Sequence, residues 1–218
     1  NERGVETIPE FFSAELAKTI KEKYGMARLI IANNVVAHMN DHHDLLNGVS
    51  TLLDKDGVFI FEAPYLTDMF DNLTFDTIYH EHLSYLALRP LVQLCKAHGM
   101  EIFDIRTHPV QGLSLRVYAG FSGMHKVLPS VQKFLDDETK RGFHILKTYQ
   151  DLGKKIAALK NDVVRHVRKL KQQGKRIVGY GAPAKGNTLL NYYGIGTDVL
   201  ECLTDGLPSK IGRYAPGT

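Results

Sequence analysis

The sequence predicts an open α/β sheet with an antiparallel hairpin edge, followed by a helical connector and the start of a second β-α-β unit. Three observations support this fold class. Short apolar runs that are typical of buried strands alternate with helical patterns over the first half of the chain. Two consecutive strand patterns then follow at residues 100–105 and 113–118. After a long helical stretch, a new strand-loop-helix pattern begins at Gly174.

The first elements alternate between strand and helix. A short strand is expected at residues 5–8, and a helix follows Ser13, which is a suitable N-cap. Residues 28–32 are a short apolar run, which is typical of a strand buried on both faces of a parallel sheet. This strand ends in Asn33 and Asn34. Because ligands of open α/β sheets bind beyond the carboxyl ends of the strands, these two residues mark a candidate site.

A second apolar strand and a hairpin complete the predicted sheet. A helix over residues 42–53 ends at an Asp-Lys-Asp-Gly turn, residues 54–57, and the strand 58–62 follows it until Pro64. The remaining elements of this part are a helix at residues 89–98 and the two hairpin strands at residues 100–105 and 113–118.

The second half begins with a helical pattern from about residue 129 to residue 173, with apolar residues spaced three or four apart. Its other face is basic, which is typical either of a nucleic-acid-binding surface or of an ordinary solvated surface. The basic residues are Lys154, Lys155, Lys160, Arg165, Arg168, Lys169 and Lys171. Beyond them we expect strands at residues 176–180 and 199–203 around a helix at 184–193. The expected parts are an α/β domain at 1–120, a helical connector at 121–173 and a second α/β domain that starts at 174–218.

Composition and charge exclude several classes of protein. The chain is 44% hydrophobic with a net charge of +3, an ordinary globular composition with too little positive charge to indicate a nucleic-acid partner. Cys95 and Cys202 are too far apart to predict a disulfide framework or a zinc module. No apolar run is long enough to span a membrane and the start has no signal-peptide pattern, so we expect a cytoplasmic protein without a membrane partner.

Four ionisable or hydrogen-bonding side chains are adjacent at Tyr79-His80-Glu81-His82, which we call the tetrad. Histidine accepts a proton near neutral pH, a carboxylate orients it, and a tyrosine hydroxyl stabilises a developing enolate oxygen. This set suits proton abstraction next to a carbonyl. The alternative is a loop whose histidines cap a helix or bridge to backbone. His38 follows a predicted strand end, so we expect it to face the same cleft as the tetrad.

A metal site is a second interpretation of the histidines. His38 and His42 have the i, i+4 spacing of some zinc sites. The glutamate of the zinc-protease motif is missing, however, and no cysteine lies nearby. We therefore expect no metal.

Residues 179–188, Gly-Tyr-Gly-Ala-Pro-Ala-Lys-Gly-Asn-Thr, form a glycine-rich loop between a predicted strand and a predicted helix. Such loops let backbone amides approach phosphates, so a nucleotide or diphosphate ligand fits. Asn187 stands where a P-loop requires lysine, so ATP hydrolysis is not expected. The alternative is that the glycines only permit a tight turn. Asp205, after the next strand, either contacts a hydroxyl-bearing ligand or caps a turn.

These motifs together resemble the S-adenosylmethionine (SAM)-dependent C-methyltransferases of deoxysugar biosynthesis. The matching blocks extend over essentially the whole chain, at residues 31–38, 75–84, 114–118, 179–191 and 212–218. The resemblance implies part of a class I methyltransferase (Rossmann-like) sheet, followed by the start of a Rossmann-like C-terminal domain, with a nucleotide-linked sugar held between them. It also implies that a zinc module, the glycine-rich SAM motif and most of the C-terminal domain fall outside these residues.

The resemblance further implies a role for individual residues. His82, supported by Glu81, would remove the proton next to the ketone, while Tyr79 and His38 would steady the enolate or the sugar hydroxyls. Cofactor contacts are implied for Asn33 and Asn34, and substrate contacts for Ser114, Arg116, Gly181, Lys185, Gly186, Asn187 and Asp205. The alternative is a non-catalytic nucleotide-sugar-binding protein of the same ancestry. Homo-oligomerisation, which would cover an exposed sheet edge, stays open as well.

Overall fold

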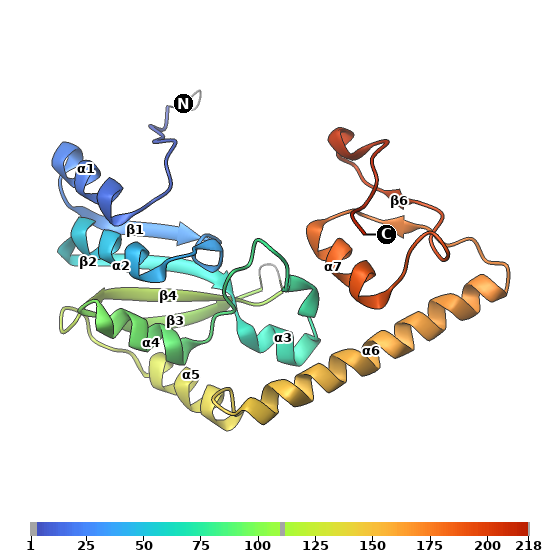
Figure 1. The fold of residues 1–218 in the computed structure, drawn as a ribbon. Coiled ribbons are helices and arrows are strands. Elements are labelled where there is room, and N and C mark those ends of the chain that lie inside the picture. The colour runs from blue at the N-terminus through green and yellow to red at the C-terminus, as the bar shows by residue number, and fades with distance from the viewer. Residues whose placement is uncertain (1–3, 110–111, 218) are drawn as a thin grey trace. The chain divides into compact units, whose positions relative to one another are not determined.

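The computed structural model describes residues 4–109 and 112–217 (Figure 1). The chain forms two compact units. Unit 1 consists of Asn1–Thr67 and Leu83–His144, and unit 2 consists of Asp68–His82 and Ile145–Thr218. Neither unit is a continuous segment, because residues 68–82 leave unit 1 and join unit 2 before the chain returns.

A mixed four-stranded sheet forms the centre of unit 1, with the strand order β1-β2-β4-β3 (Figure 1). The parallel pair is β1 with β2, and β4 runs antiparallel to both β2 and β3. The strands are β1 Ala27–Asn33, β2 Leu53–Pro64, β3 Met100–His108 and β4 Ser114–Phe121. This topology confirms the predicted α/β sheet with an antiparallel hairpin edge.

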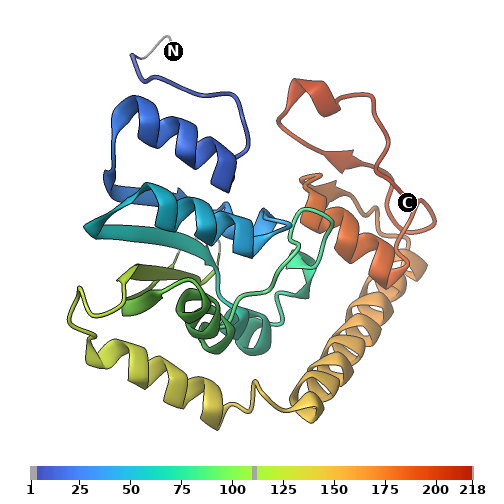
Figure 2. The same cartoon turned by 60° about the vertical axis from the view of Figure 1, so that its left-hand side comes forward.

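Four helices accompany this sheet: α1 Ala14–Tyr24, α2 His42–Leu52, α4 Leu88–Ala97 and α5 Pro129–Lys140. Ser13 caps α1 as predicted, because its hydroxyl accepts the Leu16 amide at 3.1 Å. Asp41 caps α2 in the same way. Figure 2 shows α2 and α4 next to one another against the sheet. Phe59 and Val117, both almost fully buried, belong to the core beneath them.

A buried carboxylate joins two of these helices. Glu138 of α5 is only 1% exposed. It accepts the Tyr65 hydroxyl at 3.0 Å and the first amides of α4, those of Leu88 at 2.5 Å and Arg89 at 3.0 Å. Because the first amides of a helix have no acceptor within it, Glu138 serves as a remote N-cap for α4.

Three sequence predictions for unit 1 are wrong. Residues 5–8 form no strand, and Val5 is 69% exposed. β1 is not buried on both faces, because it is the last strand of the sheet and Leu29 and Ile31 are 53% and 58% exposed. The turn expected at residues 54–57 lies within β2, beside an irregularity in the pairing with β1.

Unit 2 is built on the long helix α6 Leu146–Gln172 and a small β-α-β element. This element consists of β5 Gly179–Tyr180, α7 Ala184–Tyr193 and β6 Leu203–Thr204, with the two strands parallel. It confirms the start of a second β-α-β unit. The last strand is later and shorter than expected, because Val199 belongs to a turn and is 1% exposed in the core.

The helical stretch between the two sheets is not one element. α5 belongs to unit 1 and α6 to unit 2, with a break at residues 141–145. These units divide the chain differently from the expected domain boundaries at 120 and 173, which stay a prediction. No helix in the described part of the chain is both long and apolar enough to cross a membrane.

Much of the basic face of α6 is paired with nearby groups. Ion pairs join Lys154 to Asp151, Arg165 to Asp162 and Arg168 to Asp198. Lys160 lies over the Tyr192 ring, 4.7 Å from its centre. These contacts favour the interpretation as a solvated face over a nucleic-acid-binding surface, because such a surface needs cations available to phosphates.

Candidate active site

The tetrad lies in unit 2, directly after the single-turn helix η2 Phe75–Thr77. Tyr79 donates its hydroxyl to Glu81 Oε2 at 3.2 Å, and the Tyr79 and His82 rings are 4.6 Å apart. His82 is buried, with 8% of its surface exposed. The His80 side chain, in contrast, is 81% exposed. The structure therefore brings Tyr79, Glu81 and His82 together and directs His80 to solvent.

The tautomer of His82 follows from one hydrogen bond. Its Nδ1 lies 3.0 Å from the backbone oxygen of Thr77. Because a carbonyl oxygen only accepts, Nδ1 carries the proton and donates it. In the neutral ring the lone pair that can take up a proton is then on Nε2. An imidazole held in this way is oriented through one nitrogen and keeps its proton-accepting lone pair on the other.

The segment before the tetrad is braced by its own side chains. Asp68 accepts Asn72 Nδ2 at 2.7 Å and Thr74 Oγ1 at 3.0 Å. Leu73 between them has a φ of 53°, in the left-handed region that a leucine rarely adopts. Such strain persists only where the surrounding structure holds it, and it is concentrated at functional sites. No sequence motif marks Asp68 or Leu73, because their roles depend on local hydrogen bonds and backbone geometry.

His38 lies in unit 1, at the end of the single-turn helix η1 Val36–His38, and is exposed. The neighbouring Ala37 oxygen accepts the amides of Leu83 at 2.9 Å and Ser84 at 3.2 Å. Leu83, which follows His82, is therefore hydrogen-bonded to Ala37, which precedes His38. That the His38 and tetrad side chains face one cleft stays a prediction, because they belong to different units.

The zinc alternative gains no support from this geometry. His38 ends η1 whereas His42 begins α2, so the i, i+4 spacing does not place them on one helix face. His42 Nε2 lies 3.0 Å from the Val36 oxygen. Within residues 4–109 and 112–217, no group of three or more His, Cys, Asp or Glu side chains is arranged to hold a metal ion.

Asn33 and Asn34 lie at the carboxyl end of β1, as predicted. Asn33 pairs with Glu62 of β2, and the Asn34 amide donates to the Glu62 oxygen at 2.7 Å. Asn34 has a φ of 53°, which asparagine tolerates better than most residues. Its Oδ1 is buried and meets no donor among the described residues. A buried acceptor without a donor is a suitable partner for an N–H group of a ligand.

Arg116 and Ser114 lie on β4, which β2 separates from the end of β1. Two guanidinium nitrogens of Arg116 donate to Glu62 Oε2, at 2.9 and 2.7 Å. The Glu62 carboxylate is 6% exposed and the Arg116 side chain 33%. Ser114 is fully buried and pairs with Pro64. The observed role of Arg116 is thus to neutralise a buried carboxylate, and direct substrate contact by either residue stays a prediction.

The glycine-rich loop begins as β5 and ends as α7. Gly181 has a φ of +90°, which favours glycine, and its amide donates to the Thr204 oxygen at 2.6 Å. The Ala182 amide donates to Asp205 at 2.8 Å. These two amides already have protein acceptors, so phosphate binding would fall to the first turn of α7. Lys185 and Gly186 lie in that turn, where a helix supplies no internal acceptor for its amides.

Asp205 organises the glycine-rich loop. Its Oδ2 accepts the Ala182 amide and Lys210 Nζ, at 2.8 and 2.9 Å, and its Oδ1 accepts the Leu207 amide at 3.0 Å. The hydrogen bonds from Lys210 and these amides lower the pKa of the Asp205 carboxyl to about 2. Asp205 therefore caps a turn, the second of its two predicted roles, and also ties that turn to the loop. Contact with a ligand hydroxyl stays a prediction.

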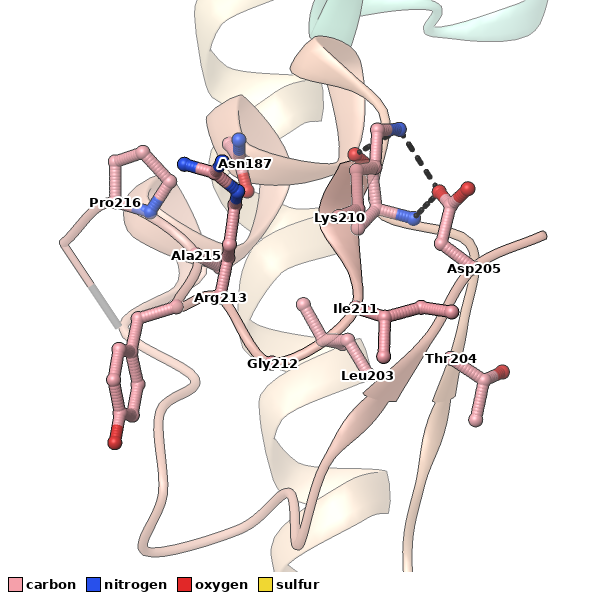
Figure 3. A pocket seen from close by; sticks show the side chains of 12 residues that line it. Asn187, Leu203, Thr204, Asp205, Lys210, Ile211, Gly212, Arg213, Ala215 and Pro216 are labelled. Carbon is pink, nitrogen blue, oxygen red and sulfur yellow. Dashed lines mark hydrogen bonds and ion pairs between the residues drawn. The ribbon is translucent and has the colours of Figure 1, made fainter. Parts of the chain in front are cut away.

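A cavity of about 480 Å³ opens beside this loop (Figure 3). Asn187 and Asp205 line it together with Lys210, Arg213 and Tyr214. The Asn187 Oδ1 is buried and has no donor in the part of the chain that the structure describes. Figure 3 shows Lys210 turned toward Asp205, with which it forms an ion pair. Among the residues drawn, the Arg213 guanidinium has no ion pair or hydrogen bond marked. Lys210, Arg213 and Tyr214 were not predicted as site residues, although the last two lie in the matching block at 212–218.

Two family models match the chain. A C-methyltransferase C-terminal domain matches residues 109–218, and a methyltransferase domain matches residues 8–105. The C-methyltransferase NovU of Streptomyces niveus is 39% identical over 219 aligned positions, which cover all of this chain and 52% of NovU. The chain thus spans about half the length of this relative. The crystal structure of M1.HpyAVI covers 52% of the chain and 54% of its own, with 13% identity and a TM-score of 0.30.

The C-terminal model alone accounts for half of the chain, and the methyltransferase model covers most of what precedes it. The tetrad lies within these matches, and so does the sheet except for the last residues of β3. The chain therefore belongs to the C-methyltransferase family.

Proposed function

We propose that the chain takes part in SAM-dependent C-methylation of a nucleotide-activated keto-deoxysugar, with His82 as the base. The observation that carries the proposal is the hydrogen bond from His82 Nδ1 to the Thr77 oxygen, 3.0 Å long. It leaves the lone pair of a buried imidazole on Nε2, within a cluster that also holds a tyrosine hydroxyl and a carboxylate.

The proposed reaction begins with proton removal. Nε2 of His82 takes the proton from the carbon next to the sugar ketone, and the C–H electron pair moves to form the enolate. The ring centres of Tyr79 and His82 are 4.6 Å apart, and the Tyr79 hydroxyl is suited to stabilise the enolate oxygen. In this structure the Tyr79 hydroxyl donates its one proton to Glu81 at 3.2 Å. To stabilise the enolate, it would turn that proton from Glu81 to the enolate oxygen when the sugar binds. The enolate carbon would then take the methyl group that SAM supplies when bound, as the bond between that methyl and the cofactor's sulfur breaks and its electron pair stays on the sulfur.

Asn34 is the residue that best fits a contact with SAM. Its buried Oδ1 meets no donor within residues 4–109 and 112–217, so an amino group of the cofactor would satisfy it. Asn33 precedes it at the same strand end. When bound, SAM supplies an electrophilic methyl group. The remaining steps, proton removal and enolate stabilisation, need only the protein side chains and the sugar.

The phosphate-bearing part of the substrate is assigned to unit 2. The 480 Å³ cavity beside the glycine-rich loop is lined by Arg213, a cation that would meet a phosphate, and by Asn187, whose buried Oδ1 would accept an N–H or O–H of the ligand. Lys210, which also lines it, is paired with Asp205. The first amides of α7 add further donors for an anion. This cavity alone would also suit a non-catalytic nucleotide-sugar-binding protein, so the base requires a direct test.

The test is hydrogen exchange at the sugar carbon next to the ketone, followed by NMR in D₂O with a dTDP-linked 4-keto-6-deoxysugar. His82→Asn is expected to slow this exchange about 100-fold or more, the usual contribution of a general base. His80→Asn is the matched control, because it alters the exposed neighbouring imidazole and should leave exchange unchanged. Undiminished exchange in His82→Asn would exclude His82 as the base.

Calorimetric titration separates the enzyme from the binding protein. The proposal requires that SAM and the dTDP-sugar both bind to a protein that carries this chain. Binding of the sugar nucleotide without any binding of SAM would favour the non-catalytic alternative.

A further inference from the structure

We propose that Phe75 is the positioning residue that sets the orientation of His82 and connects it to the helix that follows the glycine-rich loop. The inference rests on the proposed role of His82 as the base. Phe75 lies seven residues before His82 and has no polar group, so it acts only through packing.

Phe75 anchors residues 68–82 in the core of unit 2. It is 6% exposed and belongs to a cluster with Tyr193, Ile195 and Val199. Its ring meets those of Tyr192 and Tyr193 of α7 at 5.3 and 5.8 Å, in tilted or edge-on geometries that aromatic pairs prefer. Apolar side chains of α6 pack around the same cluster.

A short chain of backbone bonds leads from this anchor to the base. Phe75 begins η2 and its carbonyl accepts the Ile78 amide at 2.9 Å, which closes the turn around Thr77. The Thr77 hydroxyl donates to the Thr74 oxygen at 2.7 Å, which holds the same turn from its other side. The Thr77 carbonyl is the group that receives His82 Nδ1–H. A shift of Phe75 therefore moves the acceptor that sets the His82 tautomer.

The same anchor links the base to the proposed nucleotide cavity. Tyr192 and Tyr193 are the last residues of α7, whose first residue is Ala184 of the glycine-rich loop. Asn187, whose buried Oδ1 meets no donor among the residues that the structure describes, lies on this helix. A helix of ten residues is a stiff element about 15 Å long. Asn187 near the start of α7 lines the cavity, and Tyr192 and Tyr193 at its end contact Phe75.

Two readouts test the role of Phe75. Imidazole ¹⁵N NMR of the 218-residue chain is expected to show His82 in a single Nδ1–H tautomer, and Phe75→Ala to give a mixture of tautomers. In the D₂O exchange assay, Phe75→Ala is expected to lower kcat about 10- to 100-fold with KM unchanged within about twofold, because misplacement by about 1 Å costs that much. Phe75→Tyr, which keeps the ring, should restore both.

Phe70→Ala is the matched control. Phe70 lies in the same segment, five residues before η2, but packs edge-on against Tyr149 of α6 at 5.4 Å instead of against the tyrosines of α7. It should change neither His82 nor kcat. Should Phe75→Ala fail to fold, Phe75→Leu keeps an apolar side chain in the core and is read by the same two measurements.

An unchanged His82 tautomer in folded Phe75 variants would overturn the inference, and so would a rise in KM with kcat preserved. Exchange that persists in His82→Asn would instead remove the proposed base. The tautomer measurement still tests the packing role of Phe75 in that case, so the two failures are distinguishable.

Discussion

Replacing Glu138 with alanine is expected to destabilise unit 1 by about 4 kcal/mol. The side chain accepts three hydrogen bonds at a site that is 1% exposed. Leu88 is fully buried, so its amide would lose its acceptor without gaining water, at a cost of about 2 kcal/mol. The Tyr65 hydroxyl and the exposed Arg89 amide would lose about 1 kcal/mol each.

Native-state hydrogen exchange, measured by NMR, is the suitable assay because it reports on α4 separately from unit 2. Glu138→Ala should reduce the protection of amides in α4 about 1000-fold, the equivalent of 4 kcal/mol. Glu138→Gln keeps one acceptor and should lose about half as much. Asp136→Asn, an exposed carboxylate of the same helix, should change stability by less than about 0.5 kcal/mol. Equal protection in Glu138→Ala and Asp136→Asn would refute the remote N-cap.

Three further predictions concern single side chains. Asn34→Gly should preserve stability, because glycine accepts the φ of 53°, but should weaken SAM binding measured by calorimetry; equal affinity would remove Asn34 from the cofactor site. Because the pKa of Asp205 is lowered in the folded chain, its charged form stabilises unit 2 above about pH 4, and this contribution is lost as the pH falls from about 4 toward 2. Asp205→Asn should therefore weaken the fall in melting temperature between pH 4 and pH 2, and an unchanged fall would contradict this. A thiol reagent at pH 8 should titrate only the exposed Cys202 in the native chain, since burial raises the pKa of the Cys95 thiol to about 12; rapid reaction of two thiols would contradict the fold around Cys95.

The sequence predicted those features that depend on local patterns. Ser13 was identified as a cap because a hydroxyl before a helix bonds the next free amides, and the strand-loop-helix at the glycine-rich loop was identified from its glycines. Asn33 and Asn34 are identifiable as a candidate site because they end a predicted strand, and ligands of open α/β sheets bind beyond the carboxyl ends of the strands. The tetrad was found because its ionisable side chains are adjacent.

What sequence reasoning missed depends on contacts between distant residues. In the sequence Glu138 resembles any glutamate of an amphipathic helix. It becomes a cap only because the fold brings the Leu88 amide, 50 residues away in the chain, within hydrogen-bond distance. Thr77 acts through its carbonyl oxygen, which every residue possesses, so no residue type could have indicated it. Leu29 and Ile31 misled the prediction of burial, because an apolar run reveals which residues favour a core but not whether another strand covers them.

The discontinuous path of the chain bears on how members of this family can exchange parts. Residues 68–82 complete the core of unit 2, although the segments on either side of them in the sequence belong to unit 1. A chimera that swaps residues 145–218 between relatives would leave Phe75 facing foreign tyrosines, whereas one that also transfers residues 68–82 would keep each core intact. A chimera is therefore expected to fold when the two segments are inherited together, whereas a gene fragment that encodes only the later segment would lack Phe75 and so part of the core of unit 2.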